Sequence, residues 1–264
     1  MPKLKINDIE LYYEIHGEGE PIVFISGFSA DHTAWREIVD KFQENYQVII
    51  FDNRGAGQTD APLKDYTIEE MAEDVATLCE KLNVKKAHFV GNSMGGFILQ
   101  VLAYRYPHLV KSAIMSNTAM TTQCCFHLYV AAQLELLKAK APLATVIKAS
   151  CTWAFSFRFL TMPGMYDSLI QFSLANPYPF TLQGYEGQYA ALERFDSREW
   201  VNQIIVPTLV IGSDQDLIFS EATVKLLKSH IPNAKYFSFT ECGHLPFIEY
   251  PDQFAHVVRE FIDT

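Results

Sequence analysis

Residues 88–102 read HFVGNSMGGFILQVL, in which an apolar run, a glycine-rich turn and a second apolar run follow one another. The first run predicts a buried strand and the second a helix, with Ser93 in the sharp turn between them. Small residues stand two positions before and after this serine, at Gly91 and Gly95, because such a turn leaves no room for side chains. The pattern is typical of a nucleophilic serine, and the helix start leaves the backbone N–H of Met94 free to stabilise an oxyanion.

Apolar runs without polar alternation recur along the chain and indicate strands that are buried on both faces. Helical patterns separate most of them, and alternation over residues 4–15 predicts an antiparallel edge hairpin. We therefore predict an α/β fold, with a mostly parallel eight-stranded sheet and helices on both faces. The expected strands are 22–25, 48–51, 87–90, 112–115, 208–211 and 236–239, and the expected helices are 68–82, 95–106, 221–229 and 252–262.

Residues 120–198 break this alternation of strands and helices. The segment has few charges, is rich in leucine and aromatic residues, and contains several prolines, which together predict short helices with breaks. We interpret it as an inserted helical cap on a core of residues 1–119 and 199–264, although ordinary core helices would give a similar pattern. A cap over an apolar pocket would supply substrate contacts, for which Trp153 and Phe157 are candidates.

A serine nucleophile needs a base within hydrogen-bond reach and a carboxylate that orients this base. His244 follows the predicted strand 236–239, in a loop that can bring its imidazole over Ser93. Two carboxylates, Asp214 and Asp216, follow the predicted strand 208–211. We choose Asp216 as the acid and keep Asp214, which could instead brace a turn, as the reserve.

The elbow, the order Ser, Asp, His and the stretch DNRGAGQTD at 52–60 resemble the α/β-hydrolase superfamily over essentially the whole chain. The likeness is to capped serine hydrolases, such as carboxylesterases, enol-lactonases and carbon–carbon hydrolases. It implies a cap between the sixth and seventh core strands and supports Asp216 as the acid. It also implies that the N–H of Phe28 joins that of Met94 in an oxyanion hole, and that Arg54 is a buried ion-pair partner.

Three positions of the chain bear on this resemblance. Thr59 replaces the serine that the family usually has in the loop 52–60. Ser26 stands where relatives generally carry a histidine before Gly27, which leaves the anchoring of this loop open. Ser29 could add a hydroxyl to the substrate pocket, although a polar loop residue without such a role is the alternative.

Composition excludes several classes of function and partner. The net charge of −10 and the pI near 5.2 oppose binding to nucleic acid or to anionic membrane surfaces. The five cysteines lack the spacing of a disulfide framework or zinc site, which favours the reducing cytoplasm. No apolar run reaches the ~18 residues of a membrane span, so we expect no membrane insertion. We find no dinucleotide, P-loop or metalloprotease motif and therefore expect no cofactor and no metal.

These observations predict a serine hydrolase that cleaves a small, largely apolar carboxylic ester through an acyl-enzyme intermediate. Because cationic residues are sparse in the segment 120–198, neutral esters are favoured over diacid lactones. The alternatives are a carbon–carbon hydrolase or enol-lactonase of aromatic degradation, a hydrolase of acyl-carrier methyl esters, and a non-catalytic ligand-binding protein. The expected partner is a small-molecule ester or related acyl compound, and a homodimer stays open.

Overall fold

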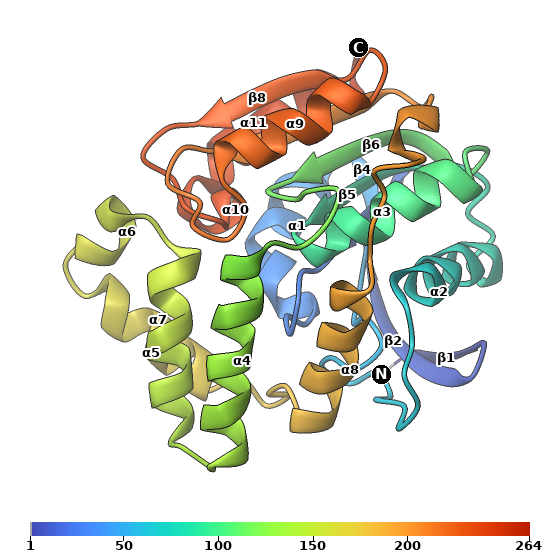
Figure 1. The fold of residues 1–264 in the computed structure, drawn as a ribbon. Helices are drawn as coiled ribbons and strands as arrows, with labels where there is room; N and C mark the ends of the chain where they lie inside the picture. Colours follow the sequence, from blue (N-terminus) through green and yellow to red (C-terminus); the bar gives the residue numbers. More distant parts are fainter. Residues whose placement is uncertain (1) are drawn as a thin grey trace.

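Eight strands form one sheet in the order β1-β2-β4-β3-β5-β6-β7-β8 (Figure 1). Strand β2 is antiparallel to β1 and β4, and all other neighbours are parallel, which confirms the predicted sheet. The computed structural model describes residues 2–264. The strands are β1 (Lys3–Ile6), β2 (Ile9–His16), β3 (Glu20–Ile25), β4 (Tyr46–Phe51), β5 (Ala87–Asn92), β6 (Val110–Ser116), β7 (Thr208–Ser213) and β8 (Lys235–Phe239).

The two faces of the sheet bury separate apolar cores. In β3, Val23 and Ile25 point into one core, whereas Ile22 and Phe24 point into the other, as the two-residue period of a strand requires. Helices α2, α3 and α9 pack into the first core, and α1 and α11 into the second. Their bounds are α1 (Arg36–Phe42), α2 (Ile68–Lys81), α3 (Met94–Arg105), α9 (Glu221–His230) and α11 (Pro251–Ile262).

Helix α2 shows why the predicted helices form where they do. Thr67 and Glu70 make a capping box, in which Glu70 N donates to Thr67 Oγ1 at 3.2 Å and Thr67 N donates to the Glu70 carboxylate at 2.9 Å. Behind this cap the apolar positions Met71, Val75 and Leu78 are buried on one face. Three short helices had no periodic pattern long enough to predict them: η1 (His32–Trp35), α10 (Pro246–Glu249) and η2 (Val201–Gln203).

Five helices lie between β6 and β7, and Figure 1 shows α4 to α7 grouped on one side of the molecule near α10. Breaks fall at prolines as expected: Pro142 precedes α5, and Pro163 and Gly164 separate α6 from α7, with Gly164 at φ 74°. No helix within residues 2–264 combines the length and apolarity that a bilayer crossing needs. The five are α4 (Cys124–Lys138), α5 (Leu143–Ala154), α6 (Phe157–Thr161), α7 (Met165–Leu174) and α8 (Leu182–Glu193).

Candidate active site

Ser93 occupies a strained turn between β5 and α3. Its φ of 56° and ψ of −119° are unusual for a residue with a side chain, and such strain costs about 1–3 kcal/mol. The turn is tight enough that a Cβ on Gly91 would lie 2.3 Å from the Gly95 carbonyl oxygen. A Cβ on Gly95 would lie 2.1 Å from the Ile25 carbonyl oxygen. The glycines that the sequence places around Ser93 are therefore required by the packing.

A carboxylate and an imidazole meet at the ends of β7 and β8. His244 Nδ1 lies 2.8 Å from Asp216 Oδ2, and both side chains are buried. The other oxygen of Asp216 accepts hydrogen bonds from Ile218 N at 2.8 Å and Phe219 N at 3.0 Å, and Asn117 Nδ2 donates to Oδ2 at 3.0 Å. Because the carboxylate accepts at Nδ1, the proton resides there and Nε2 keeps its lone pair.

Asp214, the reserve candidate, braces the histidine loop instead. Its two carboxylate oxygens accept from Glu241 N at 3.1 Å and Cys242 N at 3.2 Å. The structure therefore brings Asp216, and not Asp214, against His244. Cys242 belongs to this loop and is fully buried, and burial raises the pKa of its thiol well above the ordinary value, which disfavours the reactive thiolate.

The loop after β3 lies directly against Ser93. A Cβ on Gly27 would be 3.2 Å from the Ser93 Cβ, so the loop backbone and the serine are in contact. Ser26 anchors this loop where a histidine was expected: its hydroxyl accepts from Trp35 Nε1 at 3.0 Å and donates to the Asp31 carbonyl at 3.2 Å. The small hydroxyl thus ties the two ends of the loop to helix η1.

A residue that sequence reasoning missed, Gln188 of α8, holds the same loop from the other side. Its Oε1 accepts from Ser29 N at 2.8 Å, and its Nε2 donates to the Arg54 carbonyl at 2.9 Å. Ser29 has a φ of 58° and follows Phe28, whose backbone N–H is the expected second oxyanion donor. No sequence motif marks Gln188, and the sign of its role, a fully buried glutamine on this helix, is seen only in the structure.

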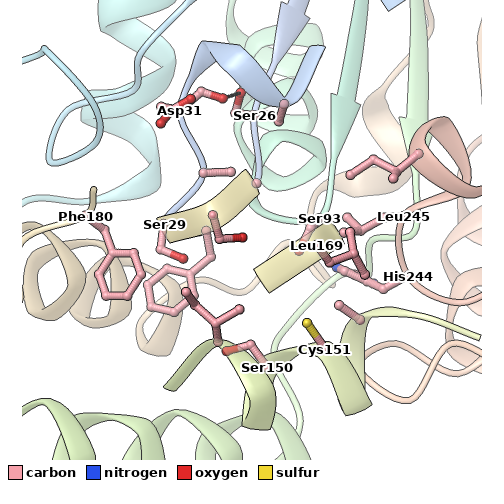
Figure 2. A pocket seen from close by; sticks show the side chains of 18 of the residues that line it. Ser26, Ser29, Asp31, Ser93, Ser150, Cys151, Leu169, Phe180, His244 and Leu245 are labelled. Carbon is pink, nitrogen blue, oxygen red and sulfur yellow. Dashed lines mark hydrogen bonds between the residues drawn. The ribbon is translucent and has the colours of Figure 1, made fainter. Parts of the chain in front are cut away.

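A pocket of about 340 Å³ connects these groups, and Figure 2 shows Ser93 and His244 at one end of it and Phe180 at the other. Ser29, the candidate for a substrate contact, lines the pocket along with Phe28. None of the described lining residues is a lysine or an arginine. The face of α5 that lines it consists of Leu143, Val146, Ile147, Ser150, Cys151 and Ala154.

Two predicted substrate contacts need correction. Trp153 is not among the lining residues, because it lies on α5 outside the face at 143, 146, 147, 150, 151 and 154 and packs on Tyr129 at 5.2 Å between ring centroids. Phe157 is 77% exposed and also lies outside the pocket lining. Its neighbour Ser156 is buried and turned inward, so that the first residue of α6 points to solvent.

The family of the chain follows from a comparison with known proteins. A family model described as alpha/beta hydrolase fold matches residues 20–251. The chain belongs to the α/β-hydrolase family. This α/β-hydrolase is 30% identical to a 3-oxoadipate enol-lactonase of Acinetobacter baylyi, over 96% of this chain and 93% of that protein.

Solved structures of other α/β-hydrolases superpose over nearly the full length. The enol-lactonase from Burkholderia xenovorans LB400 gives a TM-score of 0.88 at 26% identity and covers 100% of both chains. Est816, described as an N-acyl homoserine lactone degrading enzyme, gives a TM-score of 0.84 at 26% identity over 98% of this chain and 100% of that one. The names of these similar proteins thus include two enol-lactonases and one lactone-degrading enzyme.

The loop 52–60, which carries part of the resemblance, is structural in this α/β-hydrolase. Arg54 is buried and binds Asp74 through two bonds, from Nε at 2.6 Å and from Nη2 at 2.8 Å, which confirms the predicted ion pair. Thr59, which replaces the usual serine, fixes this loop through its hydroxyl, which donates to the Asp52 carbonyl at 2.8 Å and accepts from Tyr12 N at 2.9 Å.

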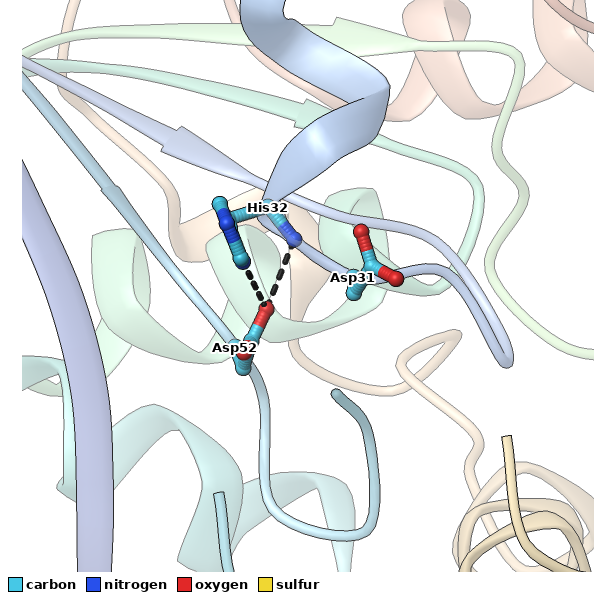
Figure 3. A group of neighbouring side chains, drawn as sticks. All are labelled: Asp31, His32 and Asp52. Atoms are coloured by element: carbon cyan, nitrogen blue, oxygen red, sulfur yellow. Dashed lines mark hydrogen bonds and ion pairs between the residues drawn. The ribbon is translucent and has the colours of Figure 1, made fainter. Parts of the chain in front are cut away.

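Asp31, which lines the pocket, clusters with His32 and Asp52, and their ligand atoms lie within 4.8 Å of one another (Figure 3). His32 donates to Asp52 Oδ1 twice, from its backbone N at 2.7 Å and from Nδ1 at 2.8 Å. Asp31 accepts from Thr33 N at 2.8 Å and from Asn176 Nδ2 at 2.6 Å. Because protein donors already occupy these atoms, the cluster fixes the loop before η1 rather than offering free ligands to a metal.

Proposed function

We propose that this α/β-hydrolase cleaves small, neutral, largely apolar carboxylic esters through an acyl-enzyme on Ser93. The observation that carries the proposal is the buried Asp216–His244 hydrogen bond at the pocket end where Ser93 stands in its strained turn. Ser93 and His244 line the same pocket and Asp216 orients the imidazole, which supports the arrangement that nucleophilic catalysis by a hydroxyl requires.

The reaction follows from these positions. His244 Nε2 takes the proton of Ser93 as its Oγ attacks the ester carbonyl, and the backbone N–H groups of Met94 and Phe28 stabilise the oxyanion. His244 then returns the proton to the departing alcohol, which leaves an acyl group on Ser93. Water, activated by the same imidazole, releases the carboxylic acid and restores the serine. Asp216 stabilises the imidazolium in both steps without taking a proton itself.

The pocket supports a neutral acyl group. Its lining is mostly aliphatic and aromatic and contains no lysine or arginine among the described residues. The carboxylate that lines it, Asp31, is already paired with Asn176 and Thr33. A free carboxylate on the substrate, in addition to the ester group, would lose its hydration in the pocket without gaining a cationic partner. Burying such an unpaired charge costs several kcal/mol.

A neutral lactone is the second candidate substrate. The enol-lactonase relatives and Est816 favour it, because a lactone is a cyclic ester and opens by the same acyl-enzyme steps. The free carboxylate that a 3-oxoadipate enol-lactone keeps would meet no lysine or arginine in this lining. A lactone with an apolar side chain has no such difficulty.

We further propose that residues 120–198 act as a cap, since α4, α5 and α7 contribute much of the pocket lining above Ser93. Opening and closing of such a cap would admit the substrate and then exclude water from the acyl transfer. We place the protein in the cytoplasm. Its five free cysteines suit a reducing compartment and support that location.

The test is hydrolysis of p-nitrophenyl esters from acetate to decanoate, alongside a series of neutral γ-lactones. We expect wild-type activity on at least one series and none above background for Ser93→Ala, which should also lose labelling by a fluorophosphonate probe. Labelling without hydrolysis of either series would contradict an ester or lactone substrate. A wild type that the probe does not label would contradict the nucleophile itself.

A further inference from the structure

Residues 154–157, from the last residue of α5 to the first of α6, make direct contact with the loop that carries His244. We call this segment the cap strap. His244 N donates to the Ala154 carbonyl at 2.8 Å, so that the backbone of the histidine itself is bound to the cap. At the other end of the strap, Phe157 N donates to Gln215 Oε1 at 3.1 Å, beside Asp216. The cap strap therefore contacts both loops from which the base and its carboxylate come.

Glu249 fastens the cap strap to the histidine loop. It ends α10, which Figure 1 shows close to the helices α5 and α6, and its side chain is only 7% exposed. Its Oε1 accepts from Gly243 N and from Ser156 N, both at 2.9 Å, and its Oε2 accepts from the Ser156 hydroxyl. One buried carboxylate thus binds the residue next to His244 and the middle of the strap at once.

The two segments leave no space between them. A Cβ on Gly243 would lie 2.7 Å from the Ala154 carbonyl oxygen and 2.7 Å from Ser156 N. Backbone of the loop therefore lies against backbone of the strap, and a shift of either one must move the other. Since His244 follows Gly243, such a shift would displace the imidazole from Ser93.

Burying a carboxylate costs free energy, and the carboxylate of Glu249 is buried rather than part of an exposed ion pair at the surface. Desolvation raises the pKa of the Glu249 carboxyl, and the donors of Ser156 and Gly243 act in the opposite direction. If the contact between the cap strap and the histidine loop served stability alone, backbone hydrogen bonds such as that from His244 N to the Ala154 carbonyl could form it without a buried carboxylate. The Glu249 carboxylate has all three of its donors only when the strap and the loop are in contact, so it stabilises the contact between the two segments.

We propose that Glu249 is a positioning residue that couples the docking of the cap to the placement of His244. The inference rests on the proposed function, because it assigns Glu249 to the same active site. When the strap is docked, Glu249 and the Ala154 carbonyl hold the histidine loop in its catalytic position. When the cap swings away to admit substrate, these bonds break and the base is released, so that acyl transfer waits for closure.

The first experiment replaces the carboxylate by its isosteric amide, Glu249→Gln, whose N–H₂ group cannot accept one of the donors. We expect kcat for the best p-nitrophenyl ester to fall by about 10²-fold, as for a misplaced catalytic group, with KM changed much less. The rate constant of fluorophosphonate labelling should fall in parallel. Glu186→Gln is the matched control, because that carboxylate lies on α8, has a side chain that is 44% exposed, and forms a surface ion pair with Lys138.

The second experiment separates positioning from mere stability. Ser156→Ala removes one of the donors to Glu249, and we expect it to lower kcat in the wild type but to add little in the Glu249→Gln background. Rates are taken per labelled active site, and thermal unfolding is followed for each variant. A purely structural role would lower the unfolding temperature and the labelled fraction, with the rate constant per site unchanged, and would overturn the inference.

The outcomes for Glu249 and for the proposed function are distinguishable. If the probe labels Ser93 in the wild type and labels Glu249→Gln at the same rate, the coupling is wrong and the hydrolase stands. If the probe does not label the wild type, the proposed serine-hydrolase function is wrong, and the inference about Glu249 that rests on it falls with it. If Glu249→Gln does not fold, Gly243→Ala tests the same joint, since its methyl must separate loop from strap and should also lower kcat with little effect on KM.

Discussion

At the scale of single residues, the two neighbouring carboxylates Asp214 and Asp216 give a matched pair for testing the site. Asp216→Asn leaves the shape intact but presents an amide to His244 Nδ1, so that the imidazole takes the wrong tautomer. We expect kcat to fall by about 10⁴-fold. Asp214→Asn weakens two bonds to loop amides and should cost about 1–3 kcal/mol of stability. Equal losses of kcat in the two variants would refute the assignment.

The Arg54–Asp74 pair supports a second prediction for single residues, on the free energy of unfolding. Both side chains are buried, and desolvation raises the pKa of the Asp74 carboxyl despite the adjacent guanidinium. Arg54→Met leaves Asp74 buried without its cation and should lower the free energy of unfolding by about 3–5 kcal/mol in urea titrations. The double variant Arg54→Met with Asp74→Leu should regain much of this loss. A double variant less stable than Arg54→Met would contradict the argument.

What the sequence could predict at this scale depends on how local each signal is. Ser93, Asp216 and His244 follow recognisable strands, so their place at one edge of a parallel sheet could be predicted. Gln188 binds an amide 159 positions away and Glu249 one that is 93 positions away. No local pattern encodes such a pairing, because the partner is a backbone N–H that any residue provides.

At the scale of elements, helix α8 holds the loop after β3, which carries the expected oxyanion donor Phe28 N–H, through Gln188. Gln188→Leu removes the acceptor of Ser29 N and the donor to the Arg54 carbonyl, so that two buried groups lose their partners. We expect kcat to fall by about 10–10²-fold with a small change in KM, measured with p-nitrophenyl esters, because one oxyanion donor is displaced. Gln133→Leu is the control, since this glutamine is also buried but its Oε1 has no hydrogen-bond partner among the described residues. A control as impaired as Gln188→Leu would count against a role specific to the loop.

Helix α5 shows where prediction at this scale stops. The sequence predicted only that residues 120–198 form short helices with breaks, whereas the pocket face of α5 follows the helical period at 143, 146, 147, 150, 151 and 154. The choice of Trp153 as a contact followed residue type, whereas the helical period decides which side chains face the pocket. The outward direction of the Phe157 side chain follows from the turn at Ser156, because Glu249 binds the Ser156 hydroxyl on the inner side. The packing of short helices against distant loops thus fixed what their sequences left open.

At the scale of the whole molecule, two sources of selectivity against anions act together. The net charge of −10 lowers the local concentration of any anionic substrate, and salt screens this effect within about 8–10 Å at 0.1–0.15 M. The pocket also disfavours an anionic substrate, since its described lining has the carboxylate of Asp31 and no lysine or arginine. Salt screens this second effect much less, because the pocket is partly shielded from solvent. Varying the ionic strength can therefore separate the field of the molecule from the chemistry of the pocket.

We predict that p-nitrophenyl esters with a carboxylate at the far end of the acyl chain react at least about 10²-fold more slowly, in kcat/KM, than neutral esters of equal length, since a desolvated charge without a partner costs several kcal/mol. Raising NaCl from 20 mM to about 0.5 M should recover only the part due to net charge, a small fraction of the ratio. Asp31→Asn, which keeps an oxygen for Thr33 N, should narrow the remaining gap. An anionic ester that reacts as fast as its neutral counterpart at low salt would instead support a lactone with a free carboxylate as the substrate and contradict the neutral pocket.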